Sequence, residues 1–237
     1  LAEDVFLQFE KVFGVSLPRE KGMDTLACLE AAFEKKIDAA LLMGGNLFSA
    51  TPNSEWAQQA LDNIGFKAFL TTTLNRGHVT GMETSEALIL PVSARDEEWQ
   101  PTTQESMFNY VRLSDGGITR LANVRPEVQI LCDLAQNLLP NCPLDFAQFK
   151  QHNNIRAAIA ATIPGMTELK DIAQTKQEFT IQNRLLDQPE FKTESGKAKF
   201  LVSAAPPQVT SNEYSFLLAS IRSEGQFNSI IYEESDS

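Results

Sequence analysis

Two short segments carry residue types that favour binding of a phosphate or a ribose. The first is Leu41–Leu47, in which Gly44, Gly45 and Asn46 follow an apolar run. Glycine has no Cβ, so a ligand at the carboxyl end of a parallel strand could reach backbone N–H groups there. The alternative is an ordinary strand-to-helix turn with no ligand.

The second segment is the tetrapeptide Asn75-Arg76-Gly77-His78, which follows the next predicted strand. An arginine fork suits phosphate oxygens, while Asn and His side chains can read the edge of a purine. Consecutive parallel strands are usually neighbours, so this loop should lie beside Gly44 and Gly45 at one edge of a sheet. A solvated loop is the alternative.

A third polar segment follows the apolar run Tyr214–Arg222. It contains more polar and glycine residues than a turn requires, and its candidate ligand contacts are Arg222, Glu224, Gly225, Gln226 and Asn228. The alternative is a loop at the rim of a domain.

The sequence has none of the common local motifs of catalysis. It lacks a Walker loop, a G-x-S-x-G elbow, an H-E-x-x-H pair and a G-x-G-x-x-G turn. Its three cysteines form no C-x-x-C pair, so this chain alone builds neither a zinc site nor an iron–sulfur cluster. We predict no catalytic residue and no metal ligand, Cys28 and Cys132 as small buried hydrophobes, and His152 at the surface.

Composition argues against two classes of partner. The formal net charge is −11, and such a surface repels nucleic-acid phosphates. The apolar runs are far shorter than the roughly 20 residues that cross a bilayer, so no membrane partner is expected. No secretory signal is visible, and the cysteine pattern fits a reducing compartment, so we expect a cytoplasmic protein.

Residues 23–91 alternate in the manner of an α/β unit. Apolar spacing predicts a helix around residues 26–33 and buried strands at Ile37–Met43 and Lys67–Thr73, with a third strand at Leu88–Leu90. Between the first two strands, Thr51-Pro52 predicts a helix start and Gly65 a helix end. This order favours right-handed crossovers and a parallel sheet, the kind of sheet found in nucleotide-binding domains.

The rest of the chain is expected to add a hairpin and helices. The hairpin joins Met107–Leu113 to Ile118–Leu121 through Asp115-Gly116-Gly117, whose glycines favour positive φ. Helices are expected from Pro126 and around residues 146–159, and Lys170–Lys197 is expected to be a long surface connection. We divide the chain into an α/β segment, 1–205, and the start of a truncated C-terminal domain, 206–237, whose first strand is Tyr214–Arg222.

Five segments, in order, resemble the bis-molybdopterin-guanine-dinucleotide oxidoreductases of the dimethyl-sulfoxide-reductase superfamily. They are similar to that family's Met-Gly-x-Asn-Pro turn, Leu-Asn-Arg-Ser-His loop, Ala-Asp-Val-Ile-Leu-Pro strand, Ser-Gly-Lys-x-x-Phe element and the opening of its C-terminal cofactor domain. The corresponding residues here are 42–46, 73–78, 87–91, 195–200 and 220–228. Leu47 replaces the usual Pro, and Ala87 stands where Asp is usual. The formate-dehydrogenase-like alpha subunits are the most similar branch.

The resemblance implies a cofactor-holding role. One guanosine-diphosphate arm would lie near Gly44, Gly45, Asn46, Asn75, Arg76 and His78, and the pterin nearer the residues of segment 222–228. The family's metal ligand has no counterpart in this chain. We therefore expect a non-catalytic segment of a larger molybdopterin oxidoreductase of the formate-dehydrogenase-like kind, with the rest of that polypeptide as its partner. We expect molybdopterin guanine dinucleotide in the full-length protein and not in this chain alone.

Other readings of the sequence remain open. The chain could be a stand-alone nucleotide-binding or regulatory α/β module, or an interaction domain that keeps the fold without a ligand. We also expect the strand Tyr214–Arg222 to pair within the chain or with a second copy of it, because an unpaired apolar strand invites association. The substrate is not specified by any of these residues.

Overall fold

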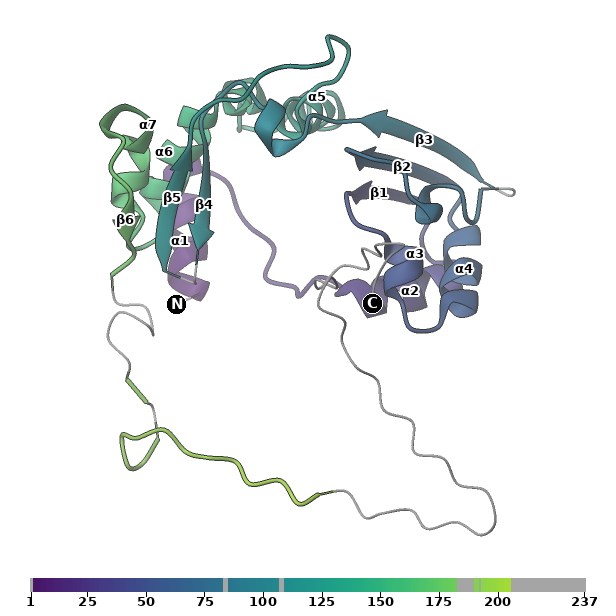
Figure 1. Ribbon diagram of the computed structural model, residues 1–237, viewed down its shortest axis with the longest axis horizontal. Helices are drawn as coiled ribbons and strands as arrows, with labels where there is room; N and C mark the ends of the chain where they lie inside the picture. The colour runs from purple at the N-terminus through teal and green to yellow at the C-terminus, as the bar shows by residue number, and fades with distance from the viewer. Residues whose placement is uncertain (1, 83–84, 107–108, 183–189, 192, 206–237) are drawn as a thin grey trace, which may run out of the picture.

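The computed structural model describes residues 2–82, 85–106, 109–182, 190–191 and 193–205 of the chain. Two small sheets, each with its own helices, make up the described part (Figure 1). One sheet is parallel and the other antiparallel, so the predicted α/β class with a parallel sheet, an added hairpin and helices is confirmed. The expected strand Tyr214–Arg222 and the expected domain 206–237 lie outside the described residues.

The first sheet has three parallel strands in the order β1-β2-β3. They are β1 (Ala39–Met43), β2 (Phe66–Thr71) and β3 (Glu86–Pro91). Their register places Leu41 beside Ala68 and Ala68 beside Leu88. Five of the six residues of the central strand β2 are buried, as predicted from its apolar run.

Three helices lie together on one side of this sheet (Figure 1). They are α2 (Thr25–Phe33), α3 (Leu47–Ala50) and α4 (Ser54–Asp62). Their shared core consists of Leu29, Ala32, Phe48, Ala60, Leu61 and Ile64. The predicted apolar stripes of α2 and α4 supply most of it.

The prediction of β1 as a buried strand is wrong. Leu41 is 43% exposed and Met43 46% exposed. The strand lies at the sheet edge, and its alternate residues face away from the helices. Cys28 is exposed as well, whereas Cys132 is buried as predicted.

The predicted helix start at Thr51-Pro52 is also displaced. Helix α4 begins at Ser54, because the side chain of Asn53 accepts a hydrogen bond from the N–H of Trp56 at 3.1 Å. The hydroxyl of Thr51 instead donates to the carbonyl of Leu47 at 2.8 Å and helps to end α3.

The second sheet is antiparallel, and the chain segments that form it are far apart in sequence. It contains β4 (Thr102–Ser106), β5 (Tyr110–Ser114) and β6 (Phe179–Thr180), in that order. Against it lie α6 (His152–Thr162), η4 (Thr167–Lys170) and α7 (Ile172–Thr175). The core here is Val111, Met166, Leu169, Ile172 and Ile181. Part of the segment predicted as a surface connection, Lys170–Lys197, is therefore core.

The predicted hairpin partner Ile118–Leu121 is wrong, since β5 pairs with the preceding strand β4. Ile118 is 78% exposed and belongs to no strand. Gly116 and Gly117 have no positive φ. Instead, they allow another backbone segment to pass close by, because an added Cβ at Gly116 would lie 1.8 Å from the carbonyl oxygen of Trp99.

The remaining helices connect and flank the two sheets. As predicted, α5 (Glu127–Leu138) follows Pro126, and η3 (Phe146–Lys150) precedes α6. An isolated parallel bridge between Val92 and Arg125 ties the start of this region to the end of β3. The 3-10 turns η1 (Arg76–His78) and η2 (Arg95–Glu97) follow β2 and β3. None of the helices in the described ranges is long and apolar enough to cross a membrane.

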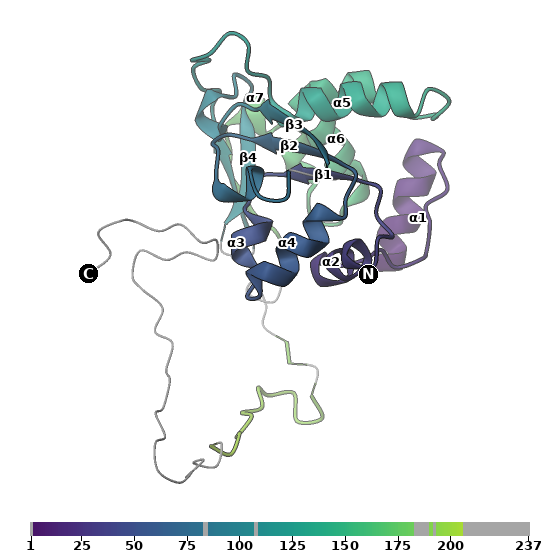
Figure 2. The same cartoon turned by 90° about the vertical axis from the view of Figure 1, so that its right-hand side faces the viewer.

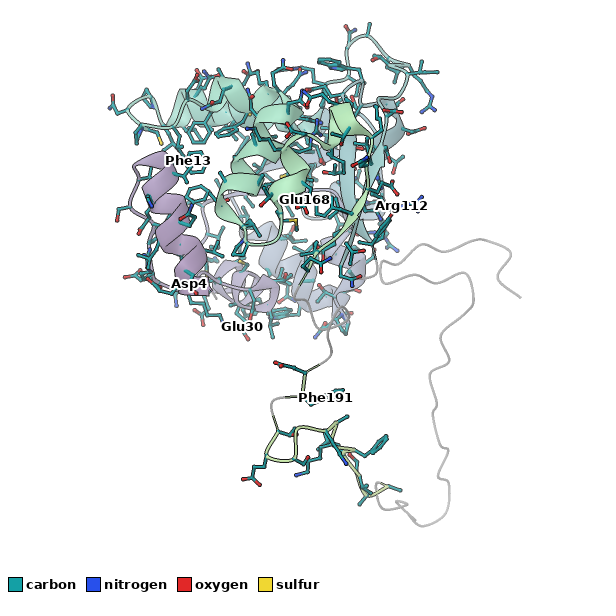
Figure 3. The ribbon with its side chains drawn as sticks, turned by 90° about the vertical axis from the view of Figure 1, so that its left-hand side faces the viewer. Asp4, Phe13, Glu30, Arg112, Glu168 and Phe191 are labelled. Atoms are coloured by element: carbon teal, nitrogen blue, oxygen red, sulfur yellow. The ribbon has the colours of Figure 1, made fainter. Side chains whose placement is uncertain are left out.

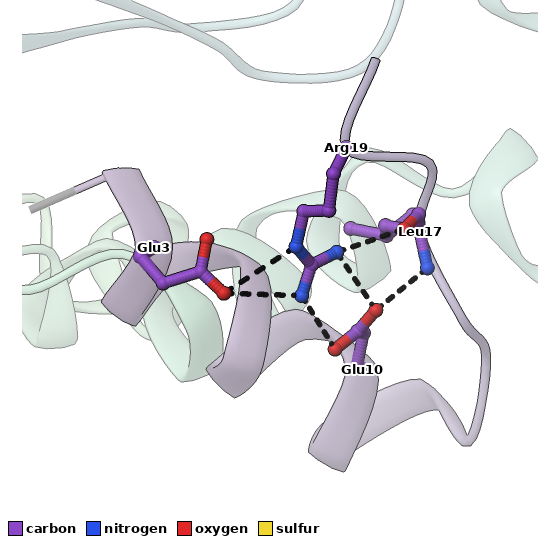
Figure 4. A network of polar contacts seen from close by, with 4 residues as sticks. All are labelled: Glu3, Glu10, Leu17 and Arg19. Atoms are coloured by element: carbon purple, nitrogen blue, oxygen red, sulfur yellow. Dashed lines mark hydrogen bonds and ion pairs between the residues drawn. The ribbon is translucent and has the colours of Figure 1, made fainter.

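Helix α1 (Ala2–Phe13) lies against α6. The ring of Phe13, which is labelled in Figure 3, lies with its centre 6.2 Å from that of Phe149. The loop that leaves α1 is folded back by Arg19 (Figure 4). Its guanidinium donates to both carboxylate oxygens of Glu10, at 2.9 and 3.0 Å, and to the carbonyl of Leu17. This bidentate bond lowers the pKa of Glu10.

Candidate functional site

The loops that follow β1 and β2 meet at the carboxyl edge of the parallel sheet. The side-chain amide of Asn75 donates a hydrogen bond to the carbonyl of Gly45 at 2.9 Å, and the N–H of Gly44 donates to the carbonyl of Leu70 at 2.7 Å. The predicted adjacency of the two loops is confirmed. Strand order explains it, because β1 and β2 are direct neighbours.

Gly44 and Gly45 face open space. Their φ angles are +61° and +71°, in the left-handed region that favours glycine. A Cβ added at either position would meet no atom within 4 Å. Backbone conformation therefore requires glycine here while packing leaves the turn uncovered, and a ligand could approach it closely.

Gly77, in contrast, has no room for a side chain. A Cβ built on it would lie 2.6 Å from Oδ1 of Asn46. That same oxygen accepts a hydrogen bond from the N–H of Ser49 at 3.1 Å and caps α3. Asn46 is thus fixed between α3 and the second loop, and its Oδ1 is already in use.

The side chains of Asn75 and His78 are engaged with their own loop. The Oδ1 of Asn75 accepts from the N–H of Gly77 at 2.9 Å, and Nδ1 of His78 accepts from the N–H of Asn75 at 3.0 Å. The His78 ring is 3% exposed and meets the ring of Phe69 edge-on. Burial lowers the pKa of His78. These two residues position the loop, and their geometry leaves little capacity to read a purine edge.

Arg76 is the exposed cation of this edge. Within the described part of the chain its guanidinium forms no hydrogen bond or ion pair, and it lies 5.8 Å from the ring centre of Phe48. It lines a polar depression of about 310 Å³ with Phe48, Asp62 and Thr80. By contrast, the enclosed space between the two loops is about 10 Å³, room for one water. A ligand at the turn would therefore lie on its open face, while the Arg76 side chain lines the neighbouring depression, which shares Phe48 with the enclosed space.

The carboxyl edge of the parallel sheet extends beyond β3, where no site was predicted. A depression of about 280 Å³ is lined by residues that follow β2 and β3, including Thr72, Ser93 and Arg95, and by Glu98 and His152. The signal was available, since Ser93–Arg95 directly follow a predicted parallel strand. The prediction that His152 lies at the surface is wrong, because only 12% of its side chain is exposed.

The structural role of Lys67 was also not predicted. Its side chain is fully buried in β2, and its ammonium donates to the carbonyls of Leu61 and Gly81 at 2.8 and 2.9 Å and to the Ser85 hydroxyl at 2.5 Å. Burial lowers the pKa of Lys67. It thereby fixes the end of α4 and the segment before β3. A single cation within an apolar strand was the available signal.

The other predicted ligand residues, Arg222, Glu224, Gly225, Gln226 and Asn228, lie outside the described residues. Among the residues that the structure describes, no group of three or more His, Cys, Asp or Glu side chains is placed to hold a metal ion.

Comparison with known proteins relates the chain to parts of longer proteins. No family model matches it. It is 32% identical, over 98% of its length, to the proteins named uncharacterized oxidoreductase Rv2900c of Mycobacterium tuberculosis and Mb2924c of Mycobacterium bovis. It is 26% identical, over 94% of its length, to the protein YdeP of Escherichia coli. The chain spans 31% of each mycobacterial relative and 30% of YdeP, about a third of their length.

Proposed function

We propose that this chain holds the guanosine-diphosphate arm of a molybdopterin-type dinucleotide cofactor, as one segment of a larger oxidoreductase. One observation carries the proposal: the open Gly44-Gly45 turn lies against the Asn75–His78 loop, from which Arg76 projects with an uncommitted guanidinium. The resemblance in the order of motifs supports the choice of cofactor. The names of the mycobacterial relatives support an oxidoreductase in general terms.

The residues fit one end of such a cofactor. Two glycines with positive φ leave backbone atoms open to a phosphate or ribose, and Arg76 supplies a bidentate donor for phosphate oxygens. Asn46, Asn75 and His78 hold the two loops in place, so they act as positioning residues. When bound, the cofactor would supply the redox chemistry at its metal, and this chain would supply placement and charge.

The proposal is tested by the nucleotide content of the purified protein. The full-length protein that contains this chain is produced in a host that makes molybdopterin guanine dinucleotide, and the GMP released by acid hydrolysis is counted per chain. Gly44→Val should lose most of this GMP, because branched carbons would occupy the open face and the positive φ would be strained. Its thermal melt should remain cooperative, since the apolar residues of β1 and β2 are unchanged.

A matched control is Gly14→Val, which also has a positive φ, +64°, and open space around it but lies at the end of α1. It should retain GMP at the wild-type level. Equal GMP in wild-type and Gly44→Val protein, or none in the wild-type protein, would contradict the proposal. GMP-free protein that still binds another nucleotide would favour a regulatory nucleotide-binding module.

A further inference from the structure

Arg156 on α6 is a buried cation without a counterion among the described residues. Its side chain is 3% exposed, and it donates to the carbonyl of Pro101 at 2.7 Å and to Oδ1 of Asn153 at 2.5 Å. Both partners are neutral, and the guanidinium forms no ion pair in the described part of the chain. Its Nε is buried with no hydrogen-bond partner. A buried charge of this kind is costly unless it is paired, so the geometry calls for an anion.

A pocket of about 220 Å³ lies beside this guanidinium. Its lining residues come from β4, α5 and α6, three elements that are labelled on the ribbon in Figures 1 and 2. One part of its wall is polar, from Thr102, Thr103 and Arg156, and the other is apolar, from Val128, Ile155 and Ile159. The pocket is smaller than the roughly 300–1,000 Å³ typical of sites for drug-sized ligands.

His152, one turn before Arg156, also lines this pocket, and its Nε2 is buried without a hydrogen-bond partner. Its Nδ1 lies 3.3 Å from the carbonyl of Pro101, which can only accept, so Nδ1 carries a proton in this contact. Its Nε2 lies 3.8 Å from Oε2 of the buried Glu98, beyond hydrogen-bond distance. The Glu98 carboxylate next to His152 adds a negative charge near the pocket, which disfavours a ligand that carries more than one negative charge.

We propose that this pocket binds a monocarboxylate with a short apolar tail. The carboxylate would pair with Arg156, while the tail would pack on Val128, Ile155 and Ile159. A single negative charge compensates the one unpaired cation, whereas a cation would be repelled and a fully polar anion would leave the apolar wall without contact. This site is separate from the Gly44-Gly45 turn, and the inference does not depend on the proposed cofactor role.

Two sources could supply this chemistry: a free small acid, or an acidic side chain of another polypeptide segment. The first is tested by titrating the purified 237-residue chain with isovalerate, with the neutral isovaleramide as the matched probe. The second is tested with N-acetyl-glutamate methylamide against its glutamine counterpart. Heats of binding and the shift in melting temperature are measured for each.

We expect at least one carboxylate to bind saturably and raise the melting temperature, and neither amide to do so. Arg156→Met should weaken that binding about tenfold or more, the loss expected for a charge-assisted hydrogen bond. The control Arg112→Met, on the exposed side of β5, should bind as the wild type does. If Arg156→Met does not fold, Val128→Phe serves instead, because it fills the pocket from its apolar wall and should also abolish binding.

Two results would overturn the inference. One is the absence of saturable binding by either carboxylate at millimolar concentration. The other is binding that the matched amide reproduces, or that Arg156→Met and Val128→Phe both leave unchanged.

Discussion

The side-chain amide of Asn75 donates to the carbonyl of Gly45 at 2.9 Å, across thirty residues of sequence. This bond joins the loop after β2, which carries Arg76, to the turn after β1, which contains the two open glycines. The Oδ1 of Asn75 also caps η1. The Asn75 side chain therefore fixes both the shape of its own loop and the distance of that loop from the turn. The proposed nucleotide site depends on this relationship.

Replacement of Asn75 separates these two roles. Asn75→Asp keeps an oxygen that accepts from the N–H of Gly77 but cannot donate to Gly45. Asn75→Ala loses both bonds. We expect Asn75→Ala to lower the free energy of unfolding by about 1–2 kcal/mol, the range for loss of a cap and a hydrogen bond, with Asn75→Asp intermediate. Urea unfolding measures both. An Asn75→Asp protein as stable as the wild type would mean that the contact with Gly45 contributes nothing.

Substitution of the buried Lys67 by a side chain of similar shape should lower the free energy of unfolding more than substitution of Asn75. Lys67→Met keeps the apolar stem but removes the hydrogen bonds that the ammonium donates to the carbonyls of Leu61 and Gly81 and to the Ser85 hydroxyl. We expect a loss of roughly 1.5–3 kcal/mol in the free energy of unfolding, the range for hydrogen bonds to a charged group. The control is Lys36→Met, whose side chain is 69% exposed and should change stability little. Increased stability in Lys67→Met would show that the desolvated charge outweighs its hydrogen bonds.

Glycine is required at Gly116 by close approach of another segment and at Gly14 by a positive φ, and alanine substitutions compare the two. Gly116→Ala places a carbon 1.8 Å from the Trp99 carbonyl and requires the backbone to move. Gly14→Ala meets nothing within 4 Å and costs only the strain of a φ of +64°, about 1 kcal/mol. Thermal melts should show a clearly larger fall in Tm for Gly116→Ala. The opposite order would mean that the segment 96–100 does not lie against Gly116 in solution.

His78 makes the stability dependent on pH. Its pKa is lowered by burial from an ordinary value of 6.5, so the unfolded chain binds a proton more readily than the folded one. The contribution of the neutral ring is complete above about pH 6.5 and is lost as the pH falls from there toward the folded-state pKa. His78→Gln, which retains an acceptor, should reduce the fall in unfolding free energy between about pH 7.5 and 5. An identical pH profile in both proteins would rule out this role.

The sequence predicted the parallel sheet and the meeting of its two loops because the relevant signals are local. Apolar stripes place α2 and α4, and glycines after a strand mark a turn. The start of α4 was misplaced because Thr51-Pro52 and Asn53 are both plausible starts, and only the bond from the N–H of Trp56 to Asn53 decides between them.

The antiparallel sheet was only partly predictable, since its pairing is decided by distant residues. Strand β5 pairs with β6, almost seventy residues later, and Ile181 completes the core around Val111. Gly116-Gly117 resembled a hairpin turn, yet these glycines allow a close approach to residues 96–99 that only the fold reveals. The hydrogen bonds of the His78 and Asn75 side chains within their own loop could not be predicted for the same reason.

Binding of GDP to the purified chain tests the central claim most directly. Titration calorimetry is carried out on the wild type, on Arg76→Ala and on the control Arg112→Ala. We predict that GDP binds the wild type and the control equally. Arg76→Ala should bind more weakly by roughly 1.5–3 kcal/mol, which is tenfold or more in Kd, because a charge-assisted bond to phosphate is lost. Equal affinity of all three proteins for GDP, or no binding to the wild type, would contradict the assignment of these loops to a nucleotide site.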